Sequence, residues 1–272
     1  MRAVAQWGEG VCGPFVQHAL ILDLSIAPWQ SAKHARPTRH TMTFDLVIFD
    51  CDGVLVDSEM LSARVLMAQL AQLGIGLDVE QFRTEFLGRS FASAAVQLKA
   101  RTGRDLPPDF APDYFVRLNA LFATDLKPMA GVQQVLKSLV VQNCVASGSI
   151  PPRLDFSLKV CGLDAHFGTH VYSAAVVKNA KPAPDLFLHA AAAHGVSPER
   201  CLVLEDSEMG VRAALAANMT VWHFAGGSHV KAGQVLPPDL HVDRVVQDMG
   251  EVLQLFREAG LCRSGDVAPK SE

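Results

Sequence analysis

The chain has 272 residues, a formal net charge of −4 at pH 7, and a composition that is 49% hydrophobic and 19% charged. Disordered chains are poor in apolar residues and rich in net charge, so this composition predicts one or two folded domains with a buried core. The sequence has no run of Lys and Arg, and no apolar stretch reaches the roughly 18 residues of a membrane span. We therefore expect neither nucleic acid nor a membrane as a partner.

The first 42 residues differ from the rest of the chain. They hold two of the three tryptophans and show no sustained periodicity, and Glu9 and Asp23 interrupt the apolar stretch that a secretory signal needs. Met42 stands just before the first convincing strand. We interpret residues 1–42 as a disordered leader or an upstream start, and we expect them to contribute nothing to catalysis.

Beyond Met42, short apolar or β-branched runs alternate with helical stretches. The runs predict strands at 46–49, 144–146, 170–172, 201–204, 220–224 and, more weakly, 245–246. The helical stretches between them are 132–141, 184–194 and 211–217. Continuous apolar strands with helical crossovers predict an α/β fold, a Rossmann-like three-layer core with a parallel sheet covered on both faces. Asn218 is expected to end the third of these helices in a left-handed conformation.

One segment, from about Ser58 to Asp125, shows no strand signal. Leu61, Leu66 and their apolar neighbours fit one helical face, and a second helix is expected to open at Pro112. We predict a small α-helical cap domain at 58–125, inserted into a core made of 43–57 and 126–261.

Polar side chains follow the predicted strands at the points where these end. In an open parallel sheet, ligands bind outside the carboxyl ends of the strands, so these residues are candidates for a site. They supply paired carboxylates, a hydroxyl and an ammonium group, which are the parts of a Mg²⁺-assisted phosphoryl-transfer site. In chain order they are Asp50, Asp52, Ser147, Gly148, Lys181, Glu205 and Asp206.

Four ordered motifs carry a resemblance to a known family. The stretch Phe49–Ser58, FDCDGVLVDS, resembles motif I of the haloacid-dehalogenase-like (HAD) superfamily of phosphatases. Val145–Ser149, Lys181–Asp185, and Leu204–Ser207 with Gly210 resemble its motifs II, III and IV. The resemblance covers about residues 44–250. The helical insert is similar to the cap of the branch that holds β-phosphoglucomutase and the sugar-phosphate and phosphoglycolate phosphatases.

The resemblance implies a two-step reaction. Asp50 would attack phosphorus and form an aspartyl-phosphate. Asp52 would protonate the leaving oxygen and then activate the water that hydrolyses the intermediate. Mg²⁺ would bind the carboxylates of Asp50 and Asp206 and the backbone carbonyl of Asp52. Glu205 would hold the other residues of the site in place without binding the ion directly, or would bind the ion through water.

Other residues are assigned to the phosphate and to the cap. Ser147, Gly148 and Lys181 are expected to contact the phosphate. Arg89 in the insert either reaches down to the substrate or is an exposed side chain. Ser149 is interpreted as an N-cap before Ile150-Pro151.

These expectations favour a Mg²⁺-dependent phosphatase that acts on a small phosphorylated metabolite, a sugar or sugar-acid phosphate. A phosphosugar mutase is the nearest alternative. The β-phosphoglucomutase pattern has a His ten residues after the second Asp of motif I, where this chain has Ser62, and residues 41–165 contain no His. A haloacid dehalogenase typically has Tyr in place of Asp52. A catalytically silent binding protein is the last alternative, although such proteins usually lose the nucleophile or a metal carboxylate.

The six cysteines form no Cys-x-x-Cys pair, and several lie within apolar runs. This pattern indicates buried free thiols in a reducing compartment, so we expect a cytoplasmic protein without disulfides or a zinc site. The sequence does not indicate an oligomeric state.

Overall fold

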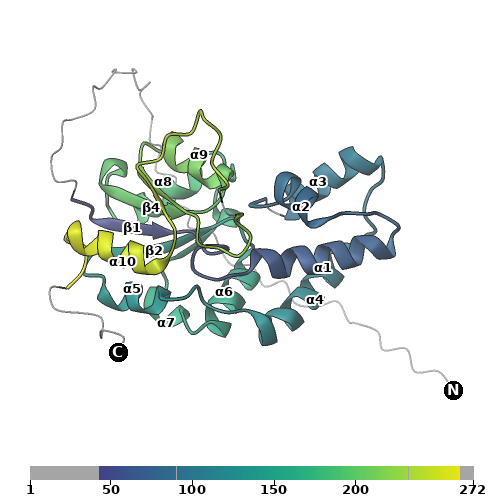
Figure 1. The fold of residues 1–272 in the computed structure, drawn as a ribbon, viewed down its shortest axis with the longest axis horizontal. Coiled ribbons are helices and arrows are strands. Elements are labelled where there is room, and N and C mark those ends of the chain that lie inside the picture. The colour runs from purple at the N-terminus through teal and green to yellow at the C-terminus, as the bar shows by residue number, and fades with distance from the viewer. Residues whose placement is uncertain (1–42, 90, 232, 264–272) are drawn as a thin grey trace, which may run out of the picture. The chain divides into compact units, whose positions relative to one another are not determined.

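The computed structural model of the protein describes residues 43–89, 91–231 and 233–263 (Figure 1). They belong to one unit of the chain, Thr41–Glu272. The prediction for residues 1–42 lies outside the described residues.

A six-stranded sheet forms the centre of this unit. All five neighbouring pairs of strands are parallel, in the order β3-β2-β1-β4-β5-β6. The strands are β1 (Leu46–Phe49), β2 (Gln142–Ser147), β3 (Val171–Ser173), β4 (Cys201–Glu205), β5 (Thr220–Phe224) and β6 (Arg244–Val246). Every residue of β1, β4 and β5 is buried, as expected of strands covered on both faces.

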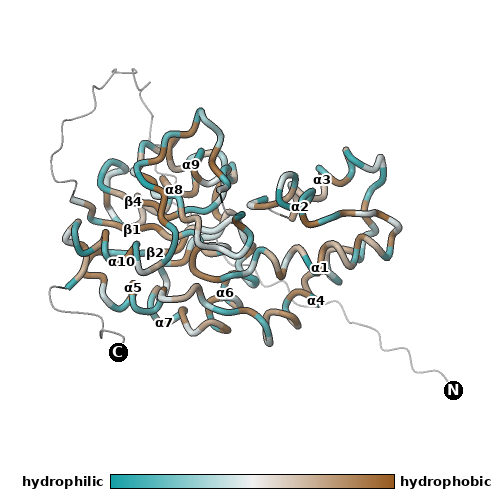
Figure 2. Tube along the Cα trace, viewed as in Figure 1, coloured by the Kyte–Doolittle hydropathy of each residue, from teal (hydrophilic) through white to brown (hydrophobic). Residues whose placement is uncertain are grey.

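Helices cover both faces of the sheet, which confirms the predicted three-layer α/β fold. Side chains of β1 alternate between two apolar clusters: Leu46 and Ile48 pack with α8 and α9, and Val47 and Phe49 pack with α5, α6, α7 and α10. Figure 2 colours β1 and β4 on the hydrophobic side of the scale. The helices of these layers are α5 (Val132–Ser138), α6 (Pro151–Val160), α7 (Asp164–Phe167), α8 (Asp185–Ala193), α9 (Glu208–Ala216) and α10 (Met249–Glu258), with short 3₁₀ turns η1 (Ala174–Val176) and η2 (Pro198–Arg200).

The chain between β1 and α5 is helical, as predicted for the cap. Its helices are α1 (Glu59–Gln72), α2 (Val79–Glu85), α3 (Phe91–Thr102) and α4 (Phe110–Asp125). Figure 1 shows α1 and α4 running alongside each other. Aromatic side chains join α3 to α4, with the Phe91 and Tyr114 ring centroids 5.2 Å apart.

Three local predictions can be compared with the structure. Asn218 has a φ of 58°, as expected of a left-handed helix end. Helix α4 begins at Phe110 rather than at Pro112. Helix α5 ends at Ser138 and not at Val141, because Leu139 forms an antiparallel bridge with Cys262 and Val140 donates to the Leu261 carbonyl. A contact with the far end of the chain therefore stops this helix.

Two further findings bear on the cysteine and membrane predictions. Cys51, Cys144, Cys161 and Cys201 are free and buried, as predicted, and Cys262 is buried as well. None of the helices in the described ranges is both long enough and apolar enough to cross a membrane.

Candidate active site

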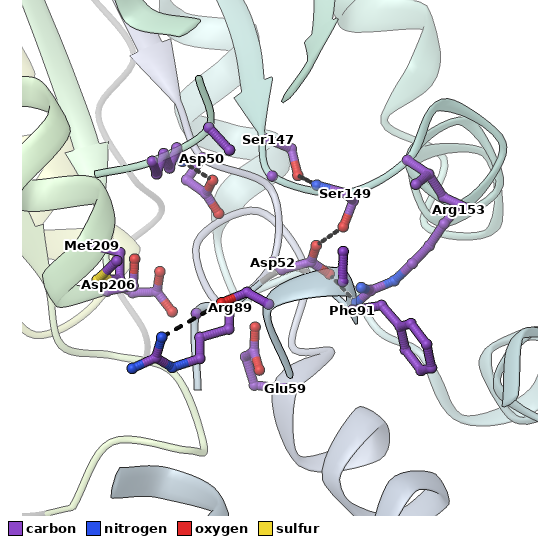
Figure 3. A pocket seen from close by; sticks show the side chains of 18 of the residues that line it. Asp50, Asp52, Glu59, Arg89, Phe91, Ser147, Ser149, Arg153, Asp206 and Met209 are labelled. Atoms are coloured by element: carbon purple, nitrogen blue, oxygen red, sulfur yellow. Dashed lines mark hydrogen bonds and ion pairs between the residues drawn. The ribbon is translucent and has the colours of Figure 1, made fainter. Parts of the chain in front are cut away.

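The site lies at the carboxyl ends of three neighbouring strands. Asp50 follows β1, Ser147 ends β2, and Asp206 follows β4, and the sheet order places β1 between the other two. A cavity of about 230 Å³ opens there between the sheet and the helical cap (Figure 3). All the residues that the sequence nominated line it: Asp50, Asp52, Arg89, Ser147, Gly148, Lys181, Glu205 and Asp206.

Lys181 lies between two of the carboxylates. Its Nζ donates to Asp50 Oδ1 at 2.5 Å and to Glu205 Oε1 at 2.7 Å. All three side chains are buried, and the Phe187 ring lies below the ammonium group, 4.8 Å from Nζ to its centroid. The buried ammonium group is thus fixed beside the predicted nucleophile.

Asp50, Glu205 and Asp206 form a cluster in which one oxygen of each lies within 4.8 Å of the others. Both oxygens of Glu205 have protein donors, since Oε2 accepts from Ser207 N at 2.7 Å and from Ser207 Oγ at 3.0 Å. Gly210 leaves the room for this carboxylate, because a Cβ there would come within 1.6 Å of Oε1. Asp50 and Asp206 keep more open oxygens than Glu205.

Gly53 allows the chain to turn close to Asp206. Its φ is +86°, and a Cβ at this position would lie 1.9 Å from Asp206 Oδ2. Any other residue would be strained by the left-handed backbone and would also push the carboxylate aside. The glycine of motif I is therefore required for the position of Asp206 as well as for the turn.

Burial, together with the crowding of carboxylates, determines the charge balance of the cluster. Burial raises the pKa of Asp50 well above its ordinary value. The charge of Lys181 opposes this shift, and the charges of Glu205 and Asp206 add to it. Burial together with Glu205 raises the pKa of Asp206 in the same way. Lys181, by contrast, outweighs burial at Glu205 and lowers the pKa of that carboxyl. The cluster thus has more negative charge than one lysine neutralises.

Asp52 lies in a different environment, among hydrogen-bond donors. Ser58 Oγ and Arg153 Nη2 donate to Oδ1 at 2.5 and 2.8 Å, and Ser149 Oγ donates to Oδ2 at 2.6 Å. Burial opposes ionisation of Asp52, but Arg153 and the two hydroxyls outweigh it and lower its pKa. These three donors hold the carboxylate in one orientation.

Ser149 corrects one prediction. The N-cap of α6 is Ile150, with no side-chain capping bond, and Ser149 bonds to Asp52 instead. Pro151 at the first helical position has no N–H to cap. The serine is therefore available for the buried carboxylate across the cavity.

Arg153 is the main residue of the site that the sequence did not indicate. It belongs to α6, and its Nη2 also lies 3.3 Å from Ser62 Oγ, at the position where the mutase pattern has His. Its guanidinium carbon lies 5.6 Å from the centroid of the Phe122 ring of α4. An Arg in the first turn of an amphipathic helix is usually exposed, so nothing in the sequence distinguishes it; only the packing of α4 on α6 buries it.

The cap contributes a second wall. At Gly88, where φ is +70°, a Cβ would lie 2.6 Å from Ser207 Cβ, so the turn before α3 rests directly on the core. Arg89 is exposed, and its Nη1 lies 3.5 Å from Ser93 Oγ. Glu59, the first residue of α1, lines the same cavity. The sequence reasoning missed Glu59, because an acid at the start of a helix is ordinary.

A loop after β5 links this site to Asp57, which precedes α1, and to the cap. Ser228 donates to Asp57 Oδ1 from both its N, at 3.2 Å, and its Oγ, at 2.7 Å. His229 is fully buried with Nε2 2.9 Å from Asp206 Oδ2, and its carbonyl accepts from Arg83 Nε of α2 at 2.9 Å. The loop thus contacts a site carboxylate, Asp57 and the cap.

The comparison with protein families agrees with this geometry. A model of the haloacid dehalogenase-like hydrolases matches residues 44–218. The chain belongs to this family of hydrolases. The match covers β1, the cap helices and the strands through β4, which carry the four motifs.

Individual relatives extend the comparison. The 6-phosphogluconate phosphatase of Escherichia coli is 29% identical over 188 residues, which are 69% of this chain and 85% of that enzyme. The fructose-1-phosphate phosphatase of the same bacterium is 31% identical over 64% of this chain and 92% of its own. A solved HAD family hydrolase from Deinococcus radiodurans, with bound phosphate and sodium, is 34% identical to this chain. The two structures align with a TM-score of 0.65 over 82% of this chain and 100% of the Deinococcus chain.

Proposed function

We propose that the protein is a Mg²⁺-dependent phosphatase that hydrolyses small phosphomonoesters through an aspartyl-phosphate. The observation that carries the proposal is the buried contact of Lys181 with Asp50, at the end of β1, beside Ser147 and the carboxylate cluster. A nucleophile, a fixed cation and a hydroxyl are thus gathered where a phosphate would enter.

In the first step, an open oxygen of Asp50 attacks phosphorus while the alcohol leaves. Lys181 keeps Asp50 oriented and counters the charge of the phosphate oxygens, and Ser147 and the Gly148 backbone hold those oxygens at the end of β2. In the second step, water attacks the phosphorus of the aspartyl-phosphate and restores Asp50.

The donor set fits Mg²⁺. The cluster offers only carboxylate oxygens, which hard divalent cations prefer, and the raised pKa values of Asp50 and Asp206 reflect negative charge without enough counter-charge. Asp50 and Asp206 would hold the ion with the Asp52 carbonyl, and Glu205, already bonded to Lys181 and Ser207, would support them. When bound, the ion would offset repulsion between the nucleophile and an anionic substrate.

Asp52 is proposed as the general acid and base. Arg153, Ser58 and Ser149 favour its ionised form, which is the form that accepts a proton from attacking water. Protonation of the leaving oxygen requires the other form, so the environment of Asp52 favours the second step over the first.

The substrate is proposed to be a sugar or sugar-acid phosphate, since two relatives are named for 6-phosphogluconate and fructose 1-phosphate and the cavity is small. We further propose that Arg89 contacts it, that 58–125 acts as the cap on a core of 43–57 and 126–261, and that the protein works in the cytoplasm, where free thiols persist.

The test is turnover of an aryl phosphate and a panel of phosphorylated metabolites. We expect phosphate release with Mg²⁺, none in EDTA, and recovery when Mg²⁺ is returned. Undiminished rates in EDTA would contradict the proposal. Rapid conversion of β-glucose 1-phosphate to glucose 6-phosphate, followed by ³¹P NMR with a trace of glucose 1,6-bisphosphate, would favour the mutase instead.

A further inference from the structure

Glu59 is a residue of the cavity wall to which the reaction above gives no task. It is the first residue of α1 and partly buried, and Figure 3 shows its carboxyl group rising into the cavity. Among residues 43–89, 91–231 and 233–263, none donates a hydrogen bond to this carboxyl group. Its oxygens face the open cavity, so a bound ligand can supply the donor that these residues do not.

The surroundings of Glu59 limit the chemistry of that ligand. Its charged neighbours include the carboxylates of Asp52 and Asp206, with Arg153 and His229 as weaker opposing influences. A carboxylate or a second phosphate placed here would face this negative charge. A neutral hydroxyl would not, and it can both donate to and accept from a carboxyl group.

The position of Glu59 along the cavity indicates which part of a substrate it meets. Ser147 and Glu59 lie on opposite sides of the cavity in Figure 3, with Asp52 between them. In the proposed reaction the phosphate sits near Ser147 and the leaving oxygen faces Asp52. The carbon chain of the leaving alcohol therefore extends toward Glu59.

We propose that Glu59 is a specificity-determining residue that binds a hydroxyl group of the leaving alcohol. The site would then select phosphomonoesters of polyhydroxylated compounds, sugar and polyol phosphates, over esters without a nearby hydroxyl. This inference rests on the proposed function and narrows its substrate class. A purely structural alternative is that Glu59 only complements the positive end of α1, which would affect all substrates alike.

The experiment compares two substrates that differ only in hydroxyl groups, glycerol 3-phosphate and propyl phosphate, with Mg²⁺ present. We expect the parent to prefer glycerol 3-phosphate by about 10-fold or more in kcat/KM, since one hydrogen bond to a site built for it has that value. Glu59→Ala should remove this preference, mostly through KM, and leave propyl phosphate within about twofold. Glu59→Gln should retain most of it, because an amide can still bond a hydroxyl.

The matched control is Glu258→Ala on α10, an exposed glutamate outside the cavity lining, which should change neither substrate. An equal loss for both substrates in Glu59→Ala, or a parent without preference, would overturn the inference. Failure of the parent to hydrolyse either ester or an aryl phosphate would instead overturn the proposed function, and this inference with it. If Glu59→Ala does not fold, the preference of the parent and the Glu59→Gln variant decide.

Discussion

Asp50 and Asp52 are two residues apart, yet they lie in two regions of opposite character. Around Asp50 are Glu205 and Asp206, and the buried Lys181 ammonium bonds to both Asp50 and Glu205. Around Asp52 are hydrogen-bond donors from three parts of the chain, Ser58, Ser149 and Arg153. The pKa of Asp50 is raised and that of Asp52 is lowered, although burial opposes ionisation of both.

The contrast indicates that neighbouring side chains, and not the motif itself, would fit the two aspartates to their proposed roles. The region of Asp50 has an excess of negative charge and suits a cation and an anionic substrate. The region of Asp52 is already neutralised and holds its carboxylate in one orientation. Pairs of titratable groups whose environments move their pKa values apart are a feature of acid–base sites. Changes directed at one region should therefore have effects that the other region does not share.

The largest effect is expected in the region of Asp50. Asp50→Asn should lower turnover by at least about 1000-fold, because an amide is nearly isosteric but a very poor nucleophile. Circular dichroism should show an intact fold. Substantial phosphate release by the folded variant would remove Asp50 from its proposed role.

A substitution in the region of Asp52 should lower activity less than Asp50→Asn does, but it should lower stability more. Arg153→Met keeps the packing on Phe122 while it leaves Asp52 buried without its cation. We expect a loss of about 2 kcal/mol in unfolding free energy and roughly 10-fold in kcat, since a buried charge without its partner is strongly destabilising.

The control is Arg200→Met, which breaks the ion pair of Arg200 with Asp45, whose side chains are 48% and 44% exposed. Exposed pairs contribute little, so the melting temperature and kcat should hardly change. Equal effects of the two substitutions would mean that the burial of the Arg153 pair has no special consequence.

These two regions were not equally predictable from the sequence. The residues around Asp50 could be predicted because they stand at strand ends: Asp50 directly follows an apolar run, and Glu205 and Asp206 follow another. Lys181 precedes Pro182 in a recognisable motif. The same holds for the sheet, whose strands are continuous apolar runs.

The region of Asp52 depends on contacts between distant segments. Arg153 becomes buried only because α4 packs on α6, and Ser149 meets Asp52 across 97 positions of sequence. The end of helix α5 was mispredicted for the same reason, because the bridge of Leu139 with Cys262 depends on a distant segment. Patterns along the chain carry no information on such contacts, and this is why Arg153 and Glu59 escaped prediction.

The raised pKa of Glu59 predicts how the stability of the protein depends on pH. Burial, with Asp52 and Asp206 nearby, raises the pKa of Glu59 from 4.5 to about 8. The folded protein therefore binds this proton more tightly than the unfolded chain, and stability falls as pH rises from 4.5 to 8. In EDTA we expect a loss of roughly 2 kcal/mol over this range, reduced in Glu59→Gln. Mg²⁺ should stabilise the protein more at pH 8 than at pH 5, because protons compete for its ligands. Thermal unfolding at several pH values checks both; a flat profile in EDTA would contradict the charge excess at the site.

The smallest expected effect concerns one hydrogen bond in the region of Asp52. Ser149→Ala removes the 2.6 Å bond to Oδ2 but leaves Arg153 and Ser58 on Oδ1, so Asp52 stays ionised and loses only part of its orientation. A hydrogen bond to a charged group contributes about 1.5 to 3 kcal/mol, and loss of about half of this from the transition state predicts a fall in kcat of roughly 5- to 10-fold with KM nearly unchanged. The matched control is Ser138→Ala, a buried serine of α5 whose Oγ bonds the Gln134 carbonyl at 2.8 Å, outside the cavity. This control should keep kcat within about twofold, since it alters no group of the site. If the two substitutions lower kcat alike, the bond from Ser149 does not orient Asp52, and the ion pair with Arg153 alone would account for its position.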